Sequence, residues 1–283
     1  MIELNRNQRK TLTPLFQGQF AGYTAESILQ GHIGRVLADQ SPANFAVLEL
    51  PHFNLCILGG NPEHPSVPEY LKGLSRFSML FFGSEDFATV AHQVHPQKWV
   101  VMERYAFSSE NLNIDRLRKF TTRLPAGFQV KRIDVELATQ LLEDKQNKFA
   151  DHHGRNFDSP EDFVTRGFGY CVLADNEIAC IASTFAVCDG GMEIQIDTKR
   201  KYRQKGLATV AAAHLIIHSL EQNIDPGWDA ATKTSAKFAQ KLGYTPQGTY
   251  PMYVFTGSKF LVYLRAVMQR LKKLWTKPED DLY

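Results

Sequence analysis

The sequence has few cysteines, and none of them forms a C-x-x-C pair. All lie in apolar, strand-like stretches, which is typical of buried free thiols in a reducing compartment. The four are Cys56, Cys171, Cys180 and Cys188. Metal-ligand spacing is also missing, because the neighbouring His152 and His153 have no further ligands at suitable intervals. We therefore expect no bound metal, and a loop at the mouth of a substrate site around these histidines.

Long apolar runs and strong charge are missing too. No segment approaches the roughly 18 apolar residues that a membrane helix needs, and the opening MIELNRNQRK lacks the apolar region of a signal peptide. The net charge of +2 and the pI near 8.3 are too mild to favour nucleic acid as the main partner. The sequence thus predicts a cytoplasmic protein with no membrane span and no nucleic-acid partner.

What is present is an ordinary globular composition spread over 283 residues, which suggests two domains or one large one. A polar helical link ends near Leu124 and Pro125, and we place the boundary there. This gives an N-terminal α/β unit at residues 1–124 and a second unit at 125–256. An amphipathic helix and an acidic tail fill residues 257–283.

The first unit mixes helices and strands. Residues 1–40 have a helical pattern, and the dipeptide Pro51-His52 is typical of a tight turn between two strands. Ser84 suits the N-cap of the helix that follows it. The expected strands are 45–50, 53–58, 77–82 and 99–107.

The second unit has a different order of elements. Strand 128–133 is followed by helix 135–149, by a loop, and by a helix that Ser159 caps. Strands, a basic turn and a long helix come next, then a short strand, a helix and a final strand. Their expected ranges are 170–174, 178–187, 192–197, 207–220, 228–231, 235–242 and 250–255.

The basic turn between the strand at 192–197 and the long helix has the features of an anion site, and the alternative is an ordinary solvated strand-to-helix turn. The first turn of a helix has N–H groups without internal partners and lies at the positive end of the helix dipole. Phosphate groups bind well there. Gly206 allows close approach of a ligand to the backbone, and Arg203 and Lys205 add positive charge.

The stretch Arg203–Ala208, RQKGLA, resembles the R/Q-x-x-G-x-G/A pyrophosphate loop of the GNAT N-acetyltransferase superfamily. The later stretch Thr234–Tyr244, TSAKFAQKLGY, is similar to a second GNAT signature on a helix that ends in K-L-G-F. The whole chain resembles the bacterial two-domain GNAT subgroup, which includes an antibiotic self-resistance acetyltransferase. The resemblance implies an α/β (α+β) fold: a GNAT unit with a mixed central sheet flanked by helices. A smaller α/β N-terminal domain precedes it. The order of its strands and helices is similar to a GNAT unit but it lacks the basic glycine turn, which suggests a degenerate GNAT-like unit.

The resemblance also implies acetyl-coenzyme A as co-substrate. Its pyrophosphate would bind the amides of the basic turn, and its pantetheine arm would pair with the edge of the central strand. A backbone N–H of Ile196 or Asp197 would polarise the thioester carbonyl, which is the logic of an oxyanion hole. The implied cofactor-binding residues are Ile194, Ile196, Asp197, Thr198, Arg203, Gln204, Lys205, Gly206, Leu207, Ala208, Thr209 and Ser235.

The catalytic residues are less directly indicated. Glu193 lies on the central strand where several family members place a glutamate base, and Asp197 is the next candidate. Glu193 has two other interpretations: a solvent-facing strand residue, or a binder of a cationic group of the substrate. The tyrosine that often protonates the leaving thiolate is replaced by Ala239. We name Tyr244 as the substitute acid; Tyr250, Tyr253 and water are the alternatives.

The implied activity is transfer of an acetyl group to a primary amine of a small molecule. One alternative is a tandem-GNAT aminoacyl transferase, which needs a broad basic groove that the mild net charge does not favour. Another is a non-catalytic acyl-coenzyme A-binding module, suggested by Ala239. The C-terminal helix has an apolar face that would dock on the body, on a second copy in a homodimer, or on a membrane surface.

Overall fold

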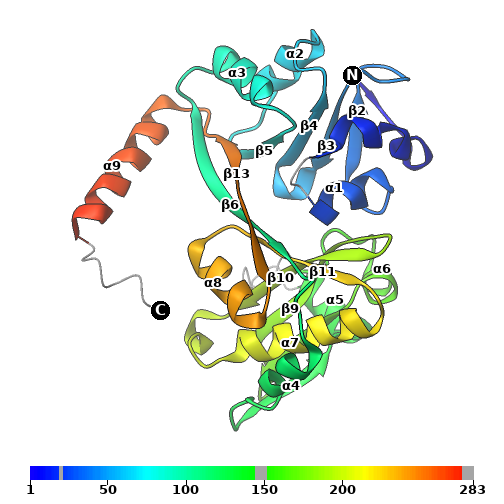
Figure 1. The fold of residues 1–283 in the computed structure, drawn as a ribbon, viewed down its shortest axis with the longest axis vertical. Coiled ribbons are helices and arrows are strands. Elements are labelled where there is room, and N and C mark those ends of the chain that lie inside the picture. Colours follow the sequence, from blue (N-terminus) through cyan, green and yellow to red (C-terminus); the bar gives the residue numbers. More distant parts are fainter. Residues whose placement is uncertain (19–21, 144–151, 276–283) are drawn as a thin grey trace.

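The computed structural model describes residues 1–18, 22–143 and 152–275, which form two sheets with helices packed around them (Figure 1). The first sheet has eight strands in the order β1-β2-β3-β4-β5-β13-β6-β12. The second has five, in the order β11-β10-β9-β8-β7. Each sheet is mixed, since one parallel pair occurs in each, β4 with β5 and β10 with β11. The mixed α/β fold predicted from the sequence is confirmed.

The first sheet contains most of the N-terminal unit. Its strands are β1 (Ile2–Glu3), β2 (Arg35–Ala38), β3 (Phe45–Leu50), β4 (Leu55–Gly60), β5 (Ser78–Phe82), β6 (Trp99–Ser108), β12 (Asp229–Ala230) and β13 (Thr245–Phe255). A 3₁₀ helix (Arg6–Phe16) and α1 (Gly22–Leu29) share one apolar core with this sheet. Helices α2 (Ser66–Lys72) and α3 (Glu85–Val94) share another with it. A short 3₁₀ turn (Pro51–Phe53) joins β3 to β4.

The helical pattern expected over residues 1–40 is wrong beyond Leu29, where α1 ends. Gly31 and Gly34 follow with φ of 81° and 60°, values that L side chains rarely adopt. A Cβ at Gly34 would lie 2.3 Å from the carbonyl oxygen of Glu49 on β3. This close approach turns the chain into β2, which pairs antiparallel with β3.

The second sheet has a helical layer on each face. Its strands are β7 (Phe128–Arg132), β8 (Gly169–Ala174), β9 (Glu177–Cys188), β10 (Gly191–Thr198) and β11 (Asp225–Gly227). On one face lie α5 (Val135–Glu143) and α6 (Pro160–Arg166); on the other lies α7 (Leu207–Glu221). Helices α4 (Ile114–Thr121) and α8 (Lys233–Leu242) share a core with α7. The part of helix 135–149 expected beyond Glu143 lies outside the described residues.

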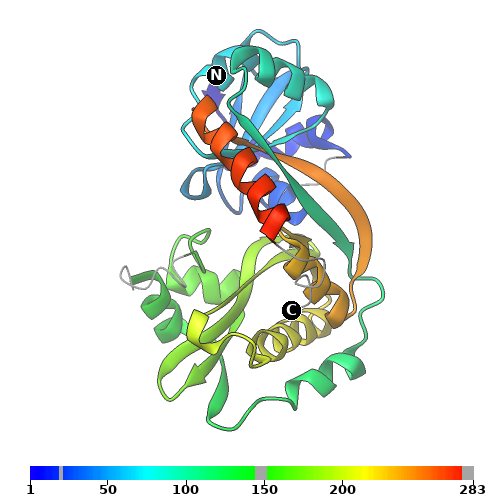
Figure 2. The ribbon, with the colours of Figure 1, turned by 90° about the vertical axis from the view of Figure 1, so that its left-hand side faces the viewer.

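The final strand connects the two units. We expected residues 250–255 to complete the second unit, but β13 lies between β5 and β6 in the first sheet. Val254, for example, is paired with Met79 on one side and with Val100 on the other. The long β6–β13 ribbon runs from the first sheet down to the second unit (Figures 1 and 2). After β13 the chain continues as α9 (Lys259–Trp275).

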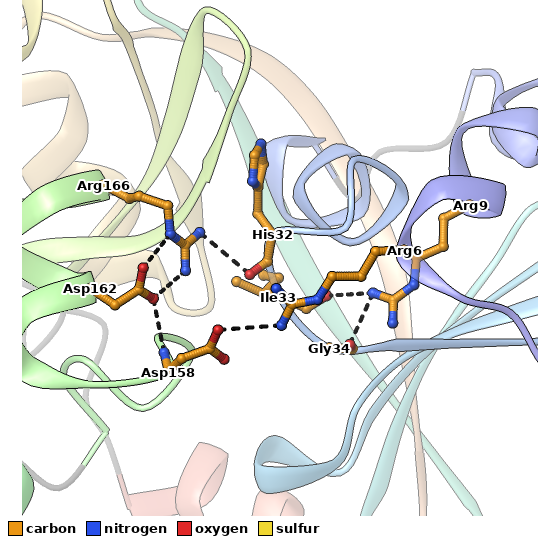
Figure 3. Close-up of polar contacts among 8 residues, drawn as sticks. All are labelled: Arg6, Arg9, His32, Ile33, Gly34, Asp158, Asp162 and Arg166. Atoms are coloured by element: carbon orange, nitrogen blue, oxygen red, sulfur yellow. Dashed lines mark hydrogen bonds and ion pairs between the residues drawn. The ribbon is translucent and has the colours of Figure 1, made fainter.

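Polar contacts also join the N-terminal segment to the second unit (Figure 3). The Arg166 guanidinium on α6 binds the carboxylate of Asp162 and donates to the carbonyl oxygen of His32 at 3.4 Å. Arg6 reaches Asp158 at 3.3 Å, but both side chains are largely exposed. Exposed ion pairs contribute little free energy, so Arg166 is the stronger polar link of the two.

The cysteines behave as the sequence predicts: all four are free and buried. Burial raises the pKa of the Cys180 thiol to about 12, so it is a packing group without nucleophilic character at neutral pH. Within the described ranges, no helix combines the length and the apolarity that crossing a membrane requires.

Candidate functional site

The site is organised by a separation between two parallel strands. β10 pairs with β11 only over residues 191–193, with the last pair at Glu193 and Gly227. The chain of β11 then continues as β12, which pairs with β6 of the first sheet. Along residues 194–198, none of the described strands pairs with β10 on that side. The backbone groups on this edge are therefore available to an extended ligand.

A β-bulge lies at the same level on the other side of β10. Glu193 is opposite Ala186 and Ile194 is opposite Thr184, so Phe185 of β9 has no partner in the ladder. Bulges bend a strand and redirect its side chains, and they are common beside active sites. Here the bulge coincides with the point of strand separation.

The basic turn adjoins the free edge of β10, as the sequence predicts. Gly206 is the N-cap of α7, with φ of 79° and without a side-chain cap for the first-turn amides. Gln204 also has a positive φ, of 63°. The side chains of Arg203 and Lys205 are exposed beside this helix start. Thr209 is buried, and its Oγ1 receives a hydrogen bond from Lys241 at 3.2 Å.

Other residues expected to bind cofactor form the surroundings of this edge. The side chains of Ile194 and Ile196 pack into the apolar cores beneath α7, so only their backbone faces the opening. Leu207 is buried in the same region, whereas Ala208 is partly exposed. Ser235, in the first turn of α8, accepts a hydrogen bond from the indole of Trp228 at 3.3 Å. Trp228 lies between β11 and β12, on the opposite side of the strand separation.

A cavity of about 460 Å³ opens between the two units at this level. Glu193 lines it at the last residue of the β10–β11 pairing. The first sheet, α1 and the β11–β12 segment form the remaining walls. The other lining residues are Gly22, Tyr23, Ala106, Phe107, Ser108, Ser109, Glu110, Asp225, Gly227, Trp228, Asp229, Gln247 and Tyr250.

Glu193 has the most strongly perturbed carboxyl group of this cavity. Its Oε1 accepts a hydrogen bond from the backbone N–H of Asp229 at 3.0 Å. Protein surrounds the carboxyl group except toward the cavity, and this desolvation raises the pKa of Glu193 to about 8. The nearby Asp229 carboxylate also raises this pKa, and Arg104 lowers it. Such a value suits a general base near neutral pH.

Two further carboxylates of the cavity are fixed in place. Arg104 of β6 binds Asp229 through two nitrogens, with Nη2 at 2.7 Å, and the hydroxyl of Tyr250 donates to Asp229 at 2.7 Å. The hydroxyls of Tyr23 and Ser109 both donate to Asp225.

This polar network was not predicted from the sequence, because its members come from four distant segments of the chain. The one local signal is the pair Asp225 and Asp229, which flank Trp228 in the stretch NIDPGWDAA.

Asp197, the second candidate base, lies outside the cavity lining. Its Oδ2 is 3.2 Å from Nε2 of His153, and Nδ1 of His153 is 2.6 Å from the hydroxyl oxygen of Ser183. His153 is only 1% exposed. It is therefore packed against β9 and β10 and does not lie at the mouth of a substrate site as we expected.

The tyrosines considered as the acid lie in three different places. Tyr244 is buried, its hydroxyl donates to the carbonyl oxygen of Pro226 at 2.9 Å, and burial raises its pKa well above the ordinary value. Tyr253 packs against Phe82 in the first sheet, with ring centroids 4.7 Å apart. Tyr250 has its hydroxyl in the cavity network and lines the cavity.

Comparison with known proteins identifies the family. The family model described as GNAT acetyltransferase matches residues 13–253 of this chain. The chain belongs to the GNAT acetyltransferase family. The matched region includes every strand of the second sheet and all of the first sheet except β1 and the last two residues of β13, so the resemblance to GNAT proteins seen in the sequence is confirmed. All residues that line the cavity between the sheets lie within the region that the GNAT family model matches.

Individual relatives support the family assignment. The protein named Uncharacterized N-acetyltransferase YdfB of Bacillus subtilis (strain 168) is 27% identical over 262 residues, covering 89% of this chain and 97% of that protein. A GCN5-related N-acetyltransferase-like protein from Streptococcus suis is also 27% identical, with a TM-score of 0.77 over 88% of this chain and 98% of that one. The tandem GNAT protein of clavulanic acid biosynthesis is 11% identical, with a TM-score of 0.58 over 89% of this chain and 97% of that one, and shows a shared fold only.

Proposed function

We propose that this GNAT protein transfers an acetyl group from acetyl-coenzyme A to a primary amine of a small molecule, with Glu193 as the general base. One observation carries the proposal: Glu193 lies where β10 and β11 separate, between the free strand edge and the cavity. A group in that position can contact both a thioester bound along the strand edge and an amine bound in the cavity.

The chain's own groups fit the co-substrate on one side of Glu193. The uncapped first turn of α7, with Gly206 in the left-handed region, suits a pyrophosphate. Arg203 and Lys205 add charge-assisted contacts, and the free edge along residues 194–198 suits the two amides of a pantetheine arm. Acetyl-coenzyme A would supply an activated thioester there. The N–H of Ile196 or Asp197 remains our proposed donor to its carbonyl oxygen.

The acceptor fits on the other side, in the cavity. A primary amine arrives mostly as an ammonium ion, which the carboxylates of Asp225 and Asp229 attract. Glu193 in its ionised form takes one proton, which leaves a neutral amine to form the C–N bond. The nitrogen of the adduct then loses its second proton to water, the C–S bond breaks, and the thiolate takes a proton to leave as the free thiol. We propose cavity-lining Tyr250 for that proton, with water as the alternative, because Tyr244 is buried outside the cavity lining and its hydroxyl already donates to the carbonyl oxygen of Pro226.

The N-terminal unit shapes the acceptor side, since Tyr23 and residues 106–110 line the cavity together with Glu193. We accordingly propose that the division near residue 124 separates an acceptor-shaping unit from a cofactor-binding unit, with β12 and β13 returning to the former.

The test is release of free thiol from acetyl-coenzyme A with a panel of small amines. We expect turnover with at least one amine, and a loss of roughly 100-fold or more in kcat for Glu193→Gln. Glu110→Gln is the matched control, because Glu110 lines the same cavity from an exposed position. Binding of acetyl-coenzyme A without thiol release from any amine would favour the acyl-coenzyme A-binding module. Transfer from an aminoacyl-tRNA would favour the tandem aminoacyl transferase.

A further inference from the structure

The C-terminal helix α9 stands apart from both sheets. It follows the end of β13 and runs along one side of the molecule (Figures 1 and 2). An open groove of about 590 Å³ separates it from the first sheet. The groove is lined by Phe77, Val100, Val254, Thr256, Leu261, Leu264, Arg265 and Met268. Seven of these eight residues are uncharged and most are apolar, so the groove is a hydrophobic surface open to solvent.

The exposed side of α9 is its apolar side. Phe260 and Tyr263 are each 68% exposed, Met268 is 61% exposed and Leu264 is 41% exposed. Their spacing of i, i+3, i+4 and i+8 places them on one face of the helix. Helices that dock on their own domain bury this face. Here Phe260 and Tyr263 are largely exposed, and Leu264 and Met268 line only the open groove, so docking on the body leaves most of this face uncovered.

The charge of α9 is of one sign. Its residues 259–275 include five basic residues and no acidic one. They are Lys259, Arg265, Arg270, Lys272 and Lys273. Arg76 precedes the groove-lining Phe77 in the chain, and its guanidinium lies 5.7 Å from the ring of Phe77, which is 55% exposed. By helical spacing, Lys259 and Arg265 therefore flank the exposed apolar stripe.

We propose that α9, together with the Arg76–Phe77 corner, is a docking surface for an anionic membrane. A basic helix with an exposed apolar and aromatic face lies in the plane of a lipid interface, with its apolar side among the acyl chains. Anionic head groups then neutralise the basic side chains. This inference concerns how the protein is placed and does not depend on the proposed acetyl transfer.

Charge also decides between a membrane and a second copy of the chain. Two α9 helices packed face to face would bring five positive charges against five, and like charges repel. An anionic lipid surface offers the opposite sign over an extended plane. A lipid surface is therefore the occupant that matches both the apolar stripe and the basic residues.

Sedimentation of the full-length protein with vesicles tests the proposal. With phosphatidylcholine vesicles containing about 30% phosphatidylglycerol, we expect roughly ten times more bound protein than with phosphatidylcholine alone. Raising the salt from about 0.05 M to about 0.5 M should release most of it, because the Debye length falls. Equal binding to both vesicles, or binding to neither, would overturn the proposal.

Two variants separate the apolar and basic contributions. The triple substitution Phe260→Ser, Tyr263→Ser, Met268→Ser and the double substitution Lys259→Gln, Arg265→Gln should each lower vesicle binding roughly tenfold. Val135→Ser, at an exposed apolar residue of α5, is the matched control and should bind as the wild type does. All variants should retain the wild-type unfolding midpoint, which shows that the fold is unchanged.

A second copy of the chain on α9 would give a different experimental result from a membrane. If α9 is a homodimer interface, analytical ultracentrifugation without lipid will show a dimer that the triple substitution dissociates. That result, together with vesicle binding unchanged by the triple substitution, would refute the membrane assignment.

Discussion

The Oε1 atom of Glu193 accepts a hydrogen bond from the backbone N–H of Asp229 at 3.0 Å, across the point where β10 and β11 separate. This contact holds the carboxyl group at the junction of the free strand edge and the cavity. It also places Glu193 beside the Asp229 carboxylate, whose charge is balanced by Arg104. Position and pKa of Glu193 therefore depend on the same small set of neighbours.

The first prediction concerns the pH dependence of catalysis. A base must be ionised, so kcat/KM for an amine should rise with pH and level off above about pH 8, the raised pKa of Glu193. In Glu193→Gln this rise should disappear, and the remaining pH dependence of kcat/KM should follow only the ionisation of the amine. Rates measured from pH 6 to pH 10 with amines of different basicity separate the two ionisations. A midpoint that follows the amine in the wild type would contradict the role of Glu193.

The second prediction concerns stability. The folded-state pKa of Glu193 is raised from 4.5 to about 8. Between these values the folded protein holds a proton that the unfolded chain has lost, so stability falls as pH rises through this window. Glu193→Gln removes this loss, so the free energy of unfolding of the variant should rise relative to that of the wild type by roughly 4 kcal/mol between pH 5 and pH 9. Urea denaturation at the two pH values measures this difference, and an equal change in both proteins would exclude a raised pKa.

The third prediction concerns Arg104, which lowers the pKa of Glu193. In Arg104→Gln the lost positive charge should raise that pKa further, and the midpoint of the pH–rate profile should move up by about one unit. Arg118→Gln is the control, because Arg118 forms exposed ion pairs with Asp115 and Glu221 far from the cavity. An unchanged midpoint of the pH–rate profile in Arg104→Gln would show that Arg104 does not set the pKa of Glu193.

The backbone geometry of the proposed cofactor site could be predicted because its signals are local. The strand, the turn at Arg203–Gly206 and the start of α7 are consecutive in the chain, and each step follows from backbone chemistry. A positive φ at Gly206 and uncapped amides require no distant partner. The resemblance to GNAT proteins is the basis for proposing coenzyme A as the ligand of a turn whose shape is already present in a short segment.

The acceptor side could not be predicted, because it is assembled from distant segments. Arg104 meets Asp229 only because β12 crosses from the second sheet to pair with β6. Strand periodicity shows that residues 250–255 form a strand but not which sheet they join. His153 is a similar case, since a pair of histidines in a polar loop gives no sign of burial against Ser183.

The last prediction tests the anion site with a matched pair of glycines. Gly206 and Gly190 have φ of 79° and 82°, and a Cβ on either would meet no atom within 4 Å. Alanine at each position therefore costs backbone strain alone, about 1 kcal/mol of unfolding free energy in both variants. Only Gly206→Ala changes the turn that presents the first-turn amides of α7, so only it should weaken coenzyme A binding, by roughly tenfold. Calorimetric titration with coenzyme A measures this, and an equal loss of affinity in Gly190→Ala, at a hairpin turn, would show that the effect is one of general stability.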